Sequence, residues 1–127
     1  MYLGQALKLC PELKILDYDL SGCADISEVL YDVVAAKTTF IEAVSCDELY
    51  ADVSFYAAAN KKNAAEIAAE FRDEFVARTG ITASVGGGPN KLIARLATAK
   101  AKPNGALIVN NEQTESFIKN VHLRSRV

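Results

Sequence analysis

The chain has 127 residues, of which 50% are hydrophobic and 24% are charged, and its formal net charge is −2. This length and balance are typical of a single globular domain. No segment approaches the roughly 18 consecutive apolar residues of a membrane-spanning helix, and the N-terminus lacks the pattern of a signal peptide, so we expect an intracellular protein with no membrane partner.

The N-terminal part of the chain predicts a helix, a strand and a second helix. Tyr2–Cys10 has apolar side chains at helical spacing, and Pro11 ends this helix. Lys14–Asp17 is a short strand candidate. Ala24–Lys37 carries an apolar face at helical spacing, with Asp25 as its expected N-cap.

Two β-prone segments follow, Thr39–Cys46 and Leu49–Ser54. They predict two strands joined by a tight turn at Asp47 and Glu48. The Asn-Gly or Asp-Gly signal of a hairpin turn is absent here, so we expect neighbouring groups to hold this turn.

The C-terminal half alternates helices and strands. Asn63–Thr79 is the clearest helix, because its apolar residues recur at helical spacing, its alanines raise helix propensity and Gly80 provides a stop. The other predicted elements are a strand at Thr82–Gly86, a helix at Asn90–Ala99, a strand at Leu107–Val109 and a helix at Gln113–Val121. This order contains most of a ferredoxin-like α/β domain, with one strand missing at the front.

The three cysteines are Cys10, Cys23 and Cys46. Their odd number and the lack of CxxC spacing argue against a disulfide framework and against a zinc site. We expect them to be buried thiols.

The charge is distributed unevenly along the chain. Residues 1–74 contain 14 acidic and 6 basic side chains, whereas residues 75–111 contain five basic side chains and no acidic one. Clustered Lys and Arg are typical of surfaces that contact phosphate or nucleic acid, and an ordinary solvated basic face is the alternative.

The adjacent carboxylates of Asp47 and Glu48 are candidate magnesium ligands, because hard cations prefer carboxylate oxygen and Mg²⁺ commonly uses one or two protein carboxylates plus substrate phosphates. An exposed structural turn is the alternative for this pair. Gly86, Gly87 and Gly88 permit the backbone to approach an anion at the start of the following helix, but they match neither a Walker loop nor a dinucleotide fingerprint.

The basic residues of the C-terminal half extend this pattern. Lys91 and Arg95 lie one helical turn apart, so both can face one phosphate backbone, while Lys100 and Lys102 lie at and beyond the end of the predicted helix. An acidic hairpin and a basic segment together suggest phosphate chemistry.

Three stretches of the chain resemble the Y-family translesion DNA polymerases of the UmuC and DinB type. The hairpin resembles the family's Ser-x-Asp-Glu-Ala-Tyr-Leu-Asp-Val motif, here Ser45–Val53, and the later motifs Ser-Val-Gly-Ile-Gly-x-Asn-Lys and Lys-Pro-Asn-Gly resemble Ser84–Lys91 and Lys102–Gly105. Motifs in the correct order are more specific than any one alone. The segments Ile41–Glu48 and Ala94–Pro103 are most similar to the Rev-type deoxycytidyl transferase branch.

The resemblance implies an α/β, ferredoxin-like polymerase palm that uses two Mg²⁺ ions. By it, Asp47 and Glu48 form the metal-binding catalytic site and Lys102 contacts the incoming triphosphate, while Lys91, Arg95 and Lys100 lie toward DNA. The implied partners are primer–template DNA and a dNTP, dCTP in the Rev-type branch, and the implied location is the nucleus. The implied activity is addition of dNMP, specifically dCMP in that branch, to a primer 3′-hydroxyl opposite damaged template in DNA repair.

The resemblance also implies that residues 1–127 are a partial UmuC-type palm domain. Residues 1–10 resemble the end of a fingers helix and residues 14–121 the palm, whereas the thumb and the family's first strand, which carries another metal-binding aspartate, have no counterpart in this sequence. We therefore expect partner segments from the rest of a polymerase, and an isolated chain without templated synthesis.

Two other functions stay open on the sequence. One is a non-catalytic DNA-binding or scaffolding module derived from such a palm. The other is an unrelated ferredoxin-like nucleotide-binding domain, which requires all the motifs to match by accident.

Overall fold

The computed structural model describes residues 1–121, which form six helices and four strands. The helices are α1 (Leu3–Leu9), α2 (Leu20–Ala35), α3 (Ser54–Asn60), α4 (Ala64–Thr79), α5 (Lys91–Ala101) and α6 (Thr114–Asn120). The strands are β1 (Ile41–Ala43), β2 (Leu49–Ala51), β3 (Val85–Gly87) and β4 (Ala106–Ile108). The order agrees with a mixed α/β domain.

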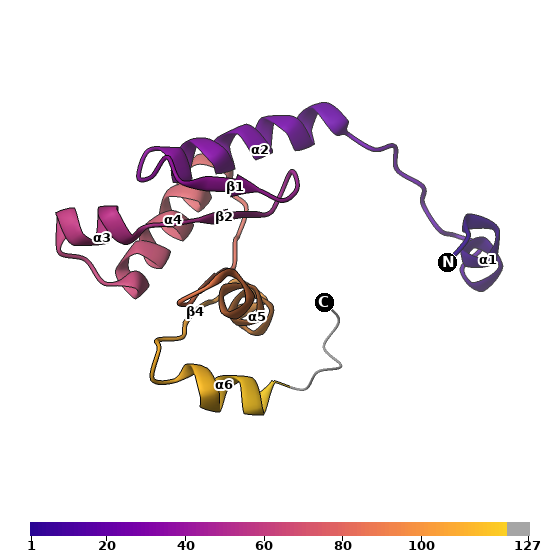
Figure 1. Cartoon of the computed structure of the whole chain (residues 1–127). Helices are drawn as coiled ribbons and strands as arrows, with labels where there is room; N and C mark the ends of the chain where they lie inside the picture. Colours follow the sequence, from indigo (N-terminus) through magenta and orange to yellow (C-terminus); the bar gives the residue numbers. More distant parts are fainter. Residues whose placement is uncertain (122–127) are drawn as a thin grey trace.

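The four strands form two separate sheets of two strands each. Strands β1 and β2 pair antiparallel, with Glu42 opposite Tyr50, and strands β3 and β4 pair parallel, with Gly86 opposite Leu107. Helix α5 connects β3 to β4, which is the crossover that parallel neighbours require. Figure 1 shows the hairpin beside α2 and α4, and α5, β4 and α6 below them.

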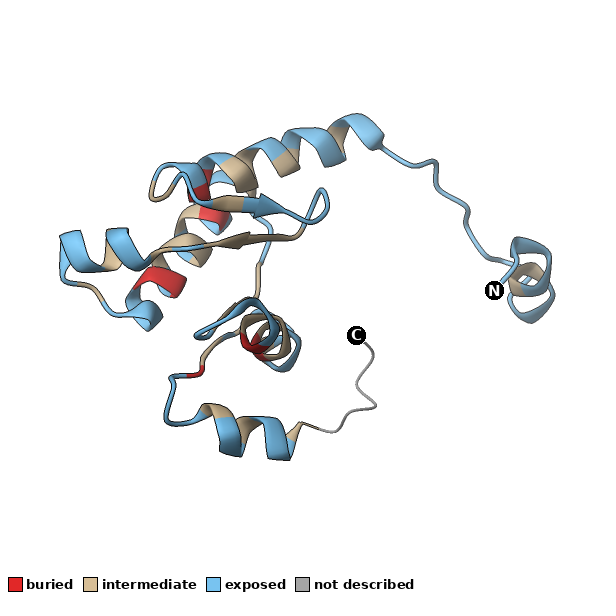
Figure 2. Cartoon of the chain, viewed as in Figure 1, coloured by how far each residue is buried: buried red, intermediate tan, exposed pale blue. Residues whose placement is uncertain are grey.

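The buried core is divided between the same two parts of the molecule (Figure 2). Helices α2 and α4 pack together, and their residues Val33, Ile67 and Phe75 are buried. A second cluster joins α5 to β4 through Ile93, Ala97 and Val109, with two half-buried residues against it. The two clusters are small, so each half depends strongly on a few apolar contacts.

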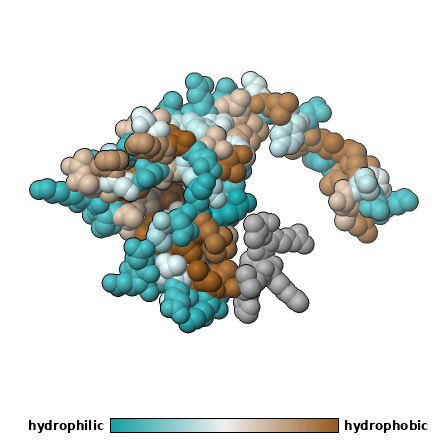
Figure 3. Space-filling model, in the orientation of Figure 1, coloured by the Kyte–Doolittle hydropathy of each residue, from teal (hydrophilic) through white to brown (hydrophobic). Residues whose placement is uncertain are grey.

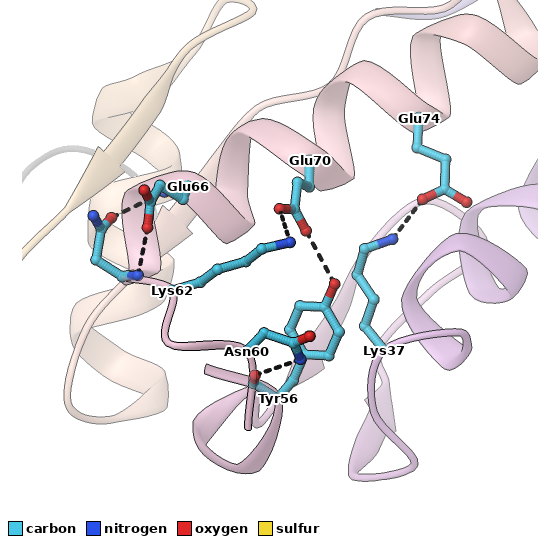
Figure 4. Close-up of polar contacts among 8 residues, drawn as sticks. Lys37, Tyr56, Asn60, Lys62, Glu66, Glu70 and Glu74 are labelled. Carbon is cyan, nitrogen blue, oxygen red and sulfur yellow. Dashed lines mark hydrogen bonds and ion pairs between the residues drawn. The ribbon is translucent and has the colours of Figure 1, made fainter. Parts of the chain in front are cut away.

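Helix α4 is the element whose ends agree best with the sequence. Asn63 and Glu66 form a capping box at its start, and Gly80 ends it with φ +71°, in the left-handed region that glycine adopts readily. Figure 4 shows the polar contacts along this helix, including ion pairs of Glu74 with Lys37 and of Glu70 with Lys62. These contacts tie α4 to the loop that follows α2 and to the loop that follows α3.

Two predictions for the N-terminal part were wrong. Residues 14–17 form no strand, because an extended segment needs a neighbouring strand for its backbone hydrogen bonds and this one has none within residues 1–121. Helix α2 begins at Leu20, before the predicted start, because the side chain of Asp19, not of Asp25, accepts a hydrogen bond from the Gly22 backbone N–H.

The hairpin also differs in detail. Its strands are shorter than predicted, and the connection is the longer loop Val44–Glu48 instead of a tight turn at two residues. Helix α3 was not predicted, and it begins at Ser54, whose backbone N–H donates to the Asp52 carboxylate. That carboxylate turns the chain out of β2 into a helix.

All three cysteines are exposed, so the prediction of buried thiols was wrong. They lie in the terminal arm, at the exposed side of α2 and in the hairpin loop, where no core is available to cover them. Within residues 1–121, none of the helices combines the length and the hydrophobicity needed to cross a membrane.

The N-terminal arm, residues 1–19, stands away from the rest of the molecule (Figure 1). Figure 3 shows that hydrophobic side chains run along it. Leu9, Ile15, Leu16 and Tyr18 are all more than half exposed. The arm therefore presents apolar surface that the other residues up to Val121 leave exposed.

Candidate functional site

A hollow of about 1920 Å³ lies between the two sheets. All residues of β2 and β3 line it, and so do the inner faces of α2 and α4. The sequence predicts metal ligands and a triphosphate contact, and all three of these residues line this hollow: Asp47, Glu48 and Lys102. They come from opposite halves of the molecule. The fold thus brings the carboxylates and a phosphate-binding candidate to the same space.

Hydrogen bonds within the hairpin give the carboxylate turn its shape. The backbone N–H groups of Val44 and Ser45 donate to the Glu48 carbonyl at 3.0 and 2.9 Å, and the Ser45 hydroxyl donates to Asp47 Oδ1 at 2.6 Å. From α2, the Tyr31 hydroxyl donates to the Ser45 carbonyl at 3.1 Å. Neighbouring groups hold the turn, as the absence of a hairpin signal suggested, and Tyr31 is a contributor that the sequence did not reveal.

The donor set of this turn suits a hard divalent cation. Asp47 is exposed and Glu48 half-buried, so both carboxylates are reachable from the hollow. Mg²⁺ prefers such oxygens and usually completes its shell with water and substrate phosphates. In residues 1–121 no three Asp, Glu, His or Cys side chains gather closely enough to enclose a metal ion. The two carboxylates fit an open, phosphate-assisted site better than a closed protein cage.

Lys91 and Arg95 reach toward the hairpin from α5. Lys91 Nζ lies 2.9 and 2.8 Å from the two carboxylate oxygens of Glu42. A hydrogen bond with Tyr50 and the charge of Glu48 raise the pKa of Arg95 above the ordinary arginine value, while burial opposes this. Lys91 is therefore ion-paired with the acidic hairpin in this structure.

Lys100 and Lys102 point to different surroundings. Lys100 Nζ lies 5.6 Å from the ring centre of Phe117, beside α6, and does not line the hollow between the sheets. Lys102 is the C-cap of α5 and lines that hollow. The four basic residues proposed from the sequence thus face at least two different environments.

Arg72 organises the loop that follows Lys102. Its guanidinium donates to the backbone carbonyl and side-chain oxygen of Asn104 at 2.7 and 2.8 Å, and to the Ala83 carbonyl at 3.1 Å. This contact connects α4, the segment before β3 and the loop after α5. The partners of Arg72 lie 11 and 32 residues away in the chain, so no local sequence pattern predicts these hydrogen bonds.

The glycine-rich turn leads into α5 with a conventional cap. The Asn90 side chain accepts a hydrogen bond from the Ile93 backbone N–H at 3.0 Å. A Cβ at Gly86 would overlap backbone atoms of Ala94 and Thr98, so the absence of a side chain permits β3 to lie directly against α5. The glycines therefore permit close packing, and this role does not depend on an anion bound at the turn.

Comparison with known proteins decides the family. The model of the impB/mucB/samB family matches residues 1–99. The chain belongs to this family. It is 43% identical over 111 residues to the DNA repair protein Rev1 of Drosophila melanogaster, which covers 87% of the chain and 11% of that relative. It is 36% identical over 124 residues to DNA polymerase IV of Pasteurella multocida, and this alignment covers 98% of the chain and 35% of that relative. The chain therefore spans about a tenth and about a third of these relatives.

Solved structures agree with this membership of the impB/mucB/samB family. A ternary complex of Dbh aligns with a TM-score of 0.85 and 25% identity over 97% of the chain and 37% of that structure. DinB from Sulfolobus solfataricus aligns with a TM-score of 0.80 and 26% identity over 91% of the chain and 34% of that structure. The resemblance to Y-family translesion polymerases and the predicted α/β fold class are both confirmed.

Proposed function

We propose that this chain forms part of the palm of a Y-family DNA polymerase, which adds a deoxynucleotide to a primer 3′-hydroxyl opposite damaged template. One observation carries the proposal: Asp47, Glu48 and Lys102 line a single hollow in a chain of the polymerase family. Acidic and basic groups that face one space are what phosphoryl transfer requires, because the reaction depends on positioning and charge stabilisation.

In this proposal each residue has a distinct task. Asp47 and Glu48 hold two Mg²⁺ ions, which when bound orient the attacking hydroxyl and neutralise the leaving pyrophosphate. Lys102 binds the triphosphate as a cation at the end of α5. Ser45 keeps the Asp47 carboxylate oriented by the hydrogen bond described above.

The proposed partners are primer–template DNA and a dNTP, dCTP by similarity to the Rev-type branch. Lys91, Arg95 and Lys100 are proposed to contact the DNA backbone, where basic side chains give salt-dependent binding. The high identity to Rev1 of Drosophila melanogaster supports the nucleus as the location and the transfer of dCMP as the reaction.

We further propose that other segments of a longer polymerase complete the site. Within residues 1–121, strands β2 and β3 each pair with one neighbour, and the residues of both strands line the hollow. An added strand between them would pair with both and bring a further carboxylate beside Asp47. In this arrangement residues 1–10 belong to the end of a fingers helix and residues 14–121 to the palm.

A chimeric polymerase tests this proposal. The segment of Pasteurella multocida DNA polymerase IV that aligns with the chain is replaced by the chain itself, and primer extension is measured with Mg²⁺. We expect extension that falls by about a hundredfold or more in Asp47→Asn. Asp25→Asn, which changes an exposed carboxylate on α2, is the matched control and should extend normally.

Two outcomes would overturn the proposal. One is a folded chimera without primer extension. The other is extension that Asp47→Asn leaves intact. Salt-dependent DNA binding by the chain that does not respond to Mg²⁺ or dCTP would instead favour a non-catalytic DNA-binding or scaffolding module.

A further inference from the structure

Lys91 occupies a position that helix stability does not explain. It is the first residue of α5, and no acidic residue lies in the first turn of that helix. The N-terminus of a helix carries a partial positive charge, so a lysine there is unfavourable for the helix itself. A contact outside α5 must compensate for this placement.

That contact is with both strands of the hairpin at once. Lys91 Nζ bonds to both oxygens of the Glu42 carboxylate and lies 5.8 Å from the ring centre of Tyr50. Glu42 on β1 and Tyr50 on β2 are directly opposite each other, so their side chains share one face of the hairpin. The ammonium group thus combines an ion pair with a cation–π contact.

The contact joins the hairpin to α5, and no shared sheet links these two elements within residues 1–121. Among the described residues, β1 and β2 pair only with each other, and so do β3 and β4. Tyr50 is two residues from Glu48 in the chain, so a group that holds Tyr50 also restrains the carboxylate turn.

We propose that Lys91 is a positioning residue, which holds the carboxylate turn in place relative to α5 through Glu42 and Tyr50. Because α5 ends at the Lys102 cap, the same contact sets the separation between Asp47, Glu48 and Lys102. This consequence rests on the proposed function, but the contact itself does not.

Hydrogen exchange on the 127-residue chain tests the contact directly. The amides of Val44 and Ser45 report on the turn, because both donate to the Glu48 carbonyl. We expect Lys91→Met and Glu42→Gln each to speed their exchange by about threefold to tenfold, which is the range for one exposed ion pair with a cation–π contact. Lys100→Met removes a charge from the same helix on another side and should leave these amides unchanged.

Salt and charge reversal separate an ionic contact from simple packing. Raising NaCl from low concentration to about 1 M should speed the exchange in the unsubstituted chain and not in Lys91→Met, because salt screens exposed pairs. The double variant Glu42→Lys with Lys91→Glu should recover most of the lost protection.

Exchange that Lys91→Met leaves unchanged, or a double variant no better than either single one, would overturn the proposal. Failure of the polymerase function would appear instead in the chimera, where primer extension would be absent while the turn amides of the chain still responded to Lys91→Met. The two proposals therefore fail in different experiments.

Discussion

At Gly86 the absence of a side chain determines how closely β3 approaches α5. An added Cβ would overlap the carbonyl of Ala94 and the backbone nitrogen of Thr98. Backbone atoms cannot move aside as the end of a flexible side chain can. The close approach of β3 to α5 therefore requires glycine at this position.

We predict that Gly86→Ala destabilises the chain by about 1 to 3 kcal/mol or more, because the strand must move away from the helix to relieve the overlap. Denaturant unfolding followed by circular dichroism measures this. Gly4→Ala is the control, since nothing lies within 4 Å of a Cβ at that position. Equal stability of Gly86→Ala and the unsubstituted chain would contradict the close packing.

At the residue scale, the sequence revealed the groups that carry charge but not the groups that position them. Asp47, Glu48 and Lys102 were selected because they stand in motifs that resemble a polymerase family. Tyr31 and Arg72 were missed because their partners lie far along the chain, and such contacts leave no local pattern. Nor does a sequence show that Lys91 is paired with Glu42.

Among the elements, α4 has the most complete set of local signals. Its apolar spacing, its alanines and its C-terminal glycine all act within a few residues, and the structure confirms a helix that Gly80 ends. Local signals were less decisive elsewhere. Asp19 and Asp25 are equally good N-cap residues by type, and only the structure shows which one caps α2.

The capping box of α4 gives a prediction at this scale. We expect Asn63→Ala to lower the free energy of unfolding by about 1 kcal/mol, because it leaves the Ala65 and Glu66 backbone N–H groups without their side-chain acceptor. Asn63→Ser keeps a capping oxygen and should lose much less. Denaturant midpoints compare the two variants, and equal losses would argue against a capping role.

The contact between Glu70 and Lys62 gives a prediction on pH (Figure 4). A hydrogen bond from Lys62 lowers the pKa of Glu70 below the ordinary value of 4.5, while burial opposes this. A carboxylate with a lowered pKa contributes stability above its unfolded-state value and loses it as the pH falls through the folded-state value. The contribution is therefore complete at neutral pH and disappears in acid.

We accordingly expect the difference in Tm between the unsubstituted chain and Glu70→Gln to be present at pH 7 and to shrink progressively below pH 4.5. Thermal unfolding at a series of pH values measures it. Glu28→Gln, at an exposed site on α2, should show a smaller difference at pH 7. A Glu70→Gln difference that stays constant into acid would show that the ion pair contributes nothing.

For the whole molecule, the strand pattern of the sequence anticipated a ferredoxin-like order without its first strand, and the structure shows two separate sheets with a hollow between them. The predicted strand at residues 14–17 does not form, because no neighbouring strand within residues 1–121 pairs with it. Local β propensity identifies a segment that is able to pair, but pairing requires a free edge at the right place.

We predict that the isolated chain folds but associates into oligomers, because the unpaired sides of β2 and β3 and the apolar N-terminal arm are available to other copies. Size-exclusion chromatography measures this, with oligomers as the expected result. A chain that stays monomeric at all concentrations tested would contradict it.

The central claim is that the carboxylate turn and Lys102 bind one metal-bound nucleotide between them. The most direct measurement uses the chimeric polymerase and a dCTP analogue with a reactive acyl group on its terminal phosphate. This group acylates a lysine near the triphosphate, and mass spectrometry then identifies the modified residue. We predict modification of Lys102 that requires Mg²⁺ and is lost in Asp47→Asn. Modification spread evenly over the exposed lysines, or modification of Lys102 that ignores both Mg²⁺ and Asp47→Asn, would contradict the claim.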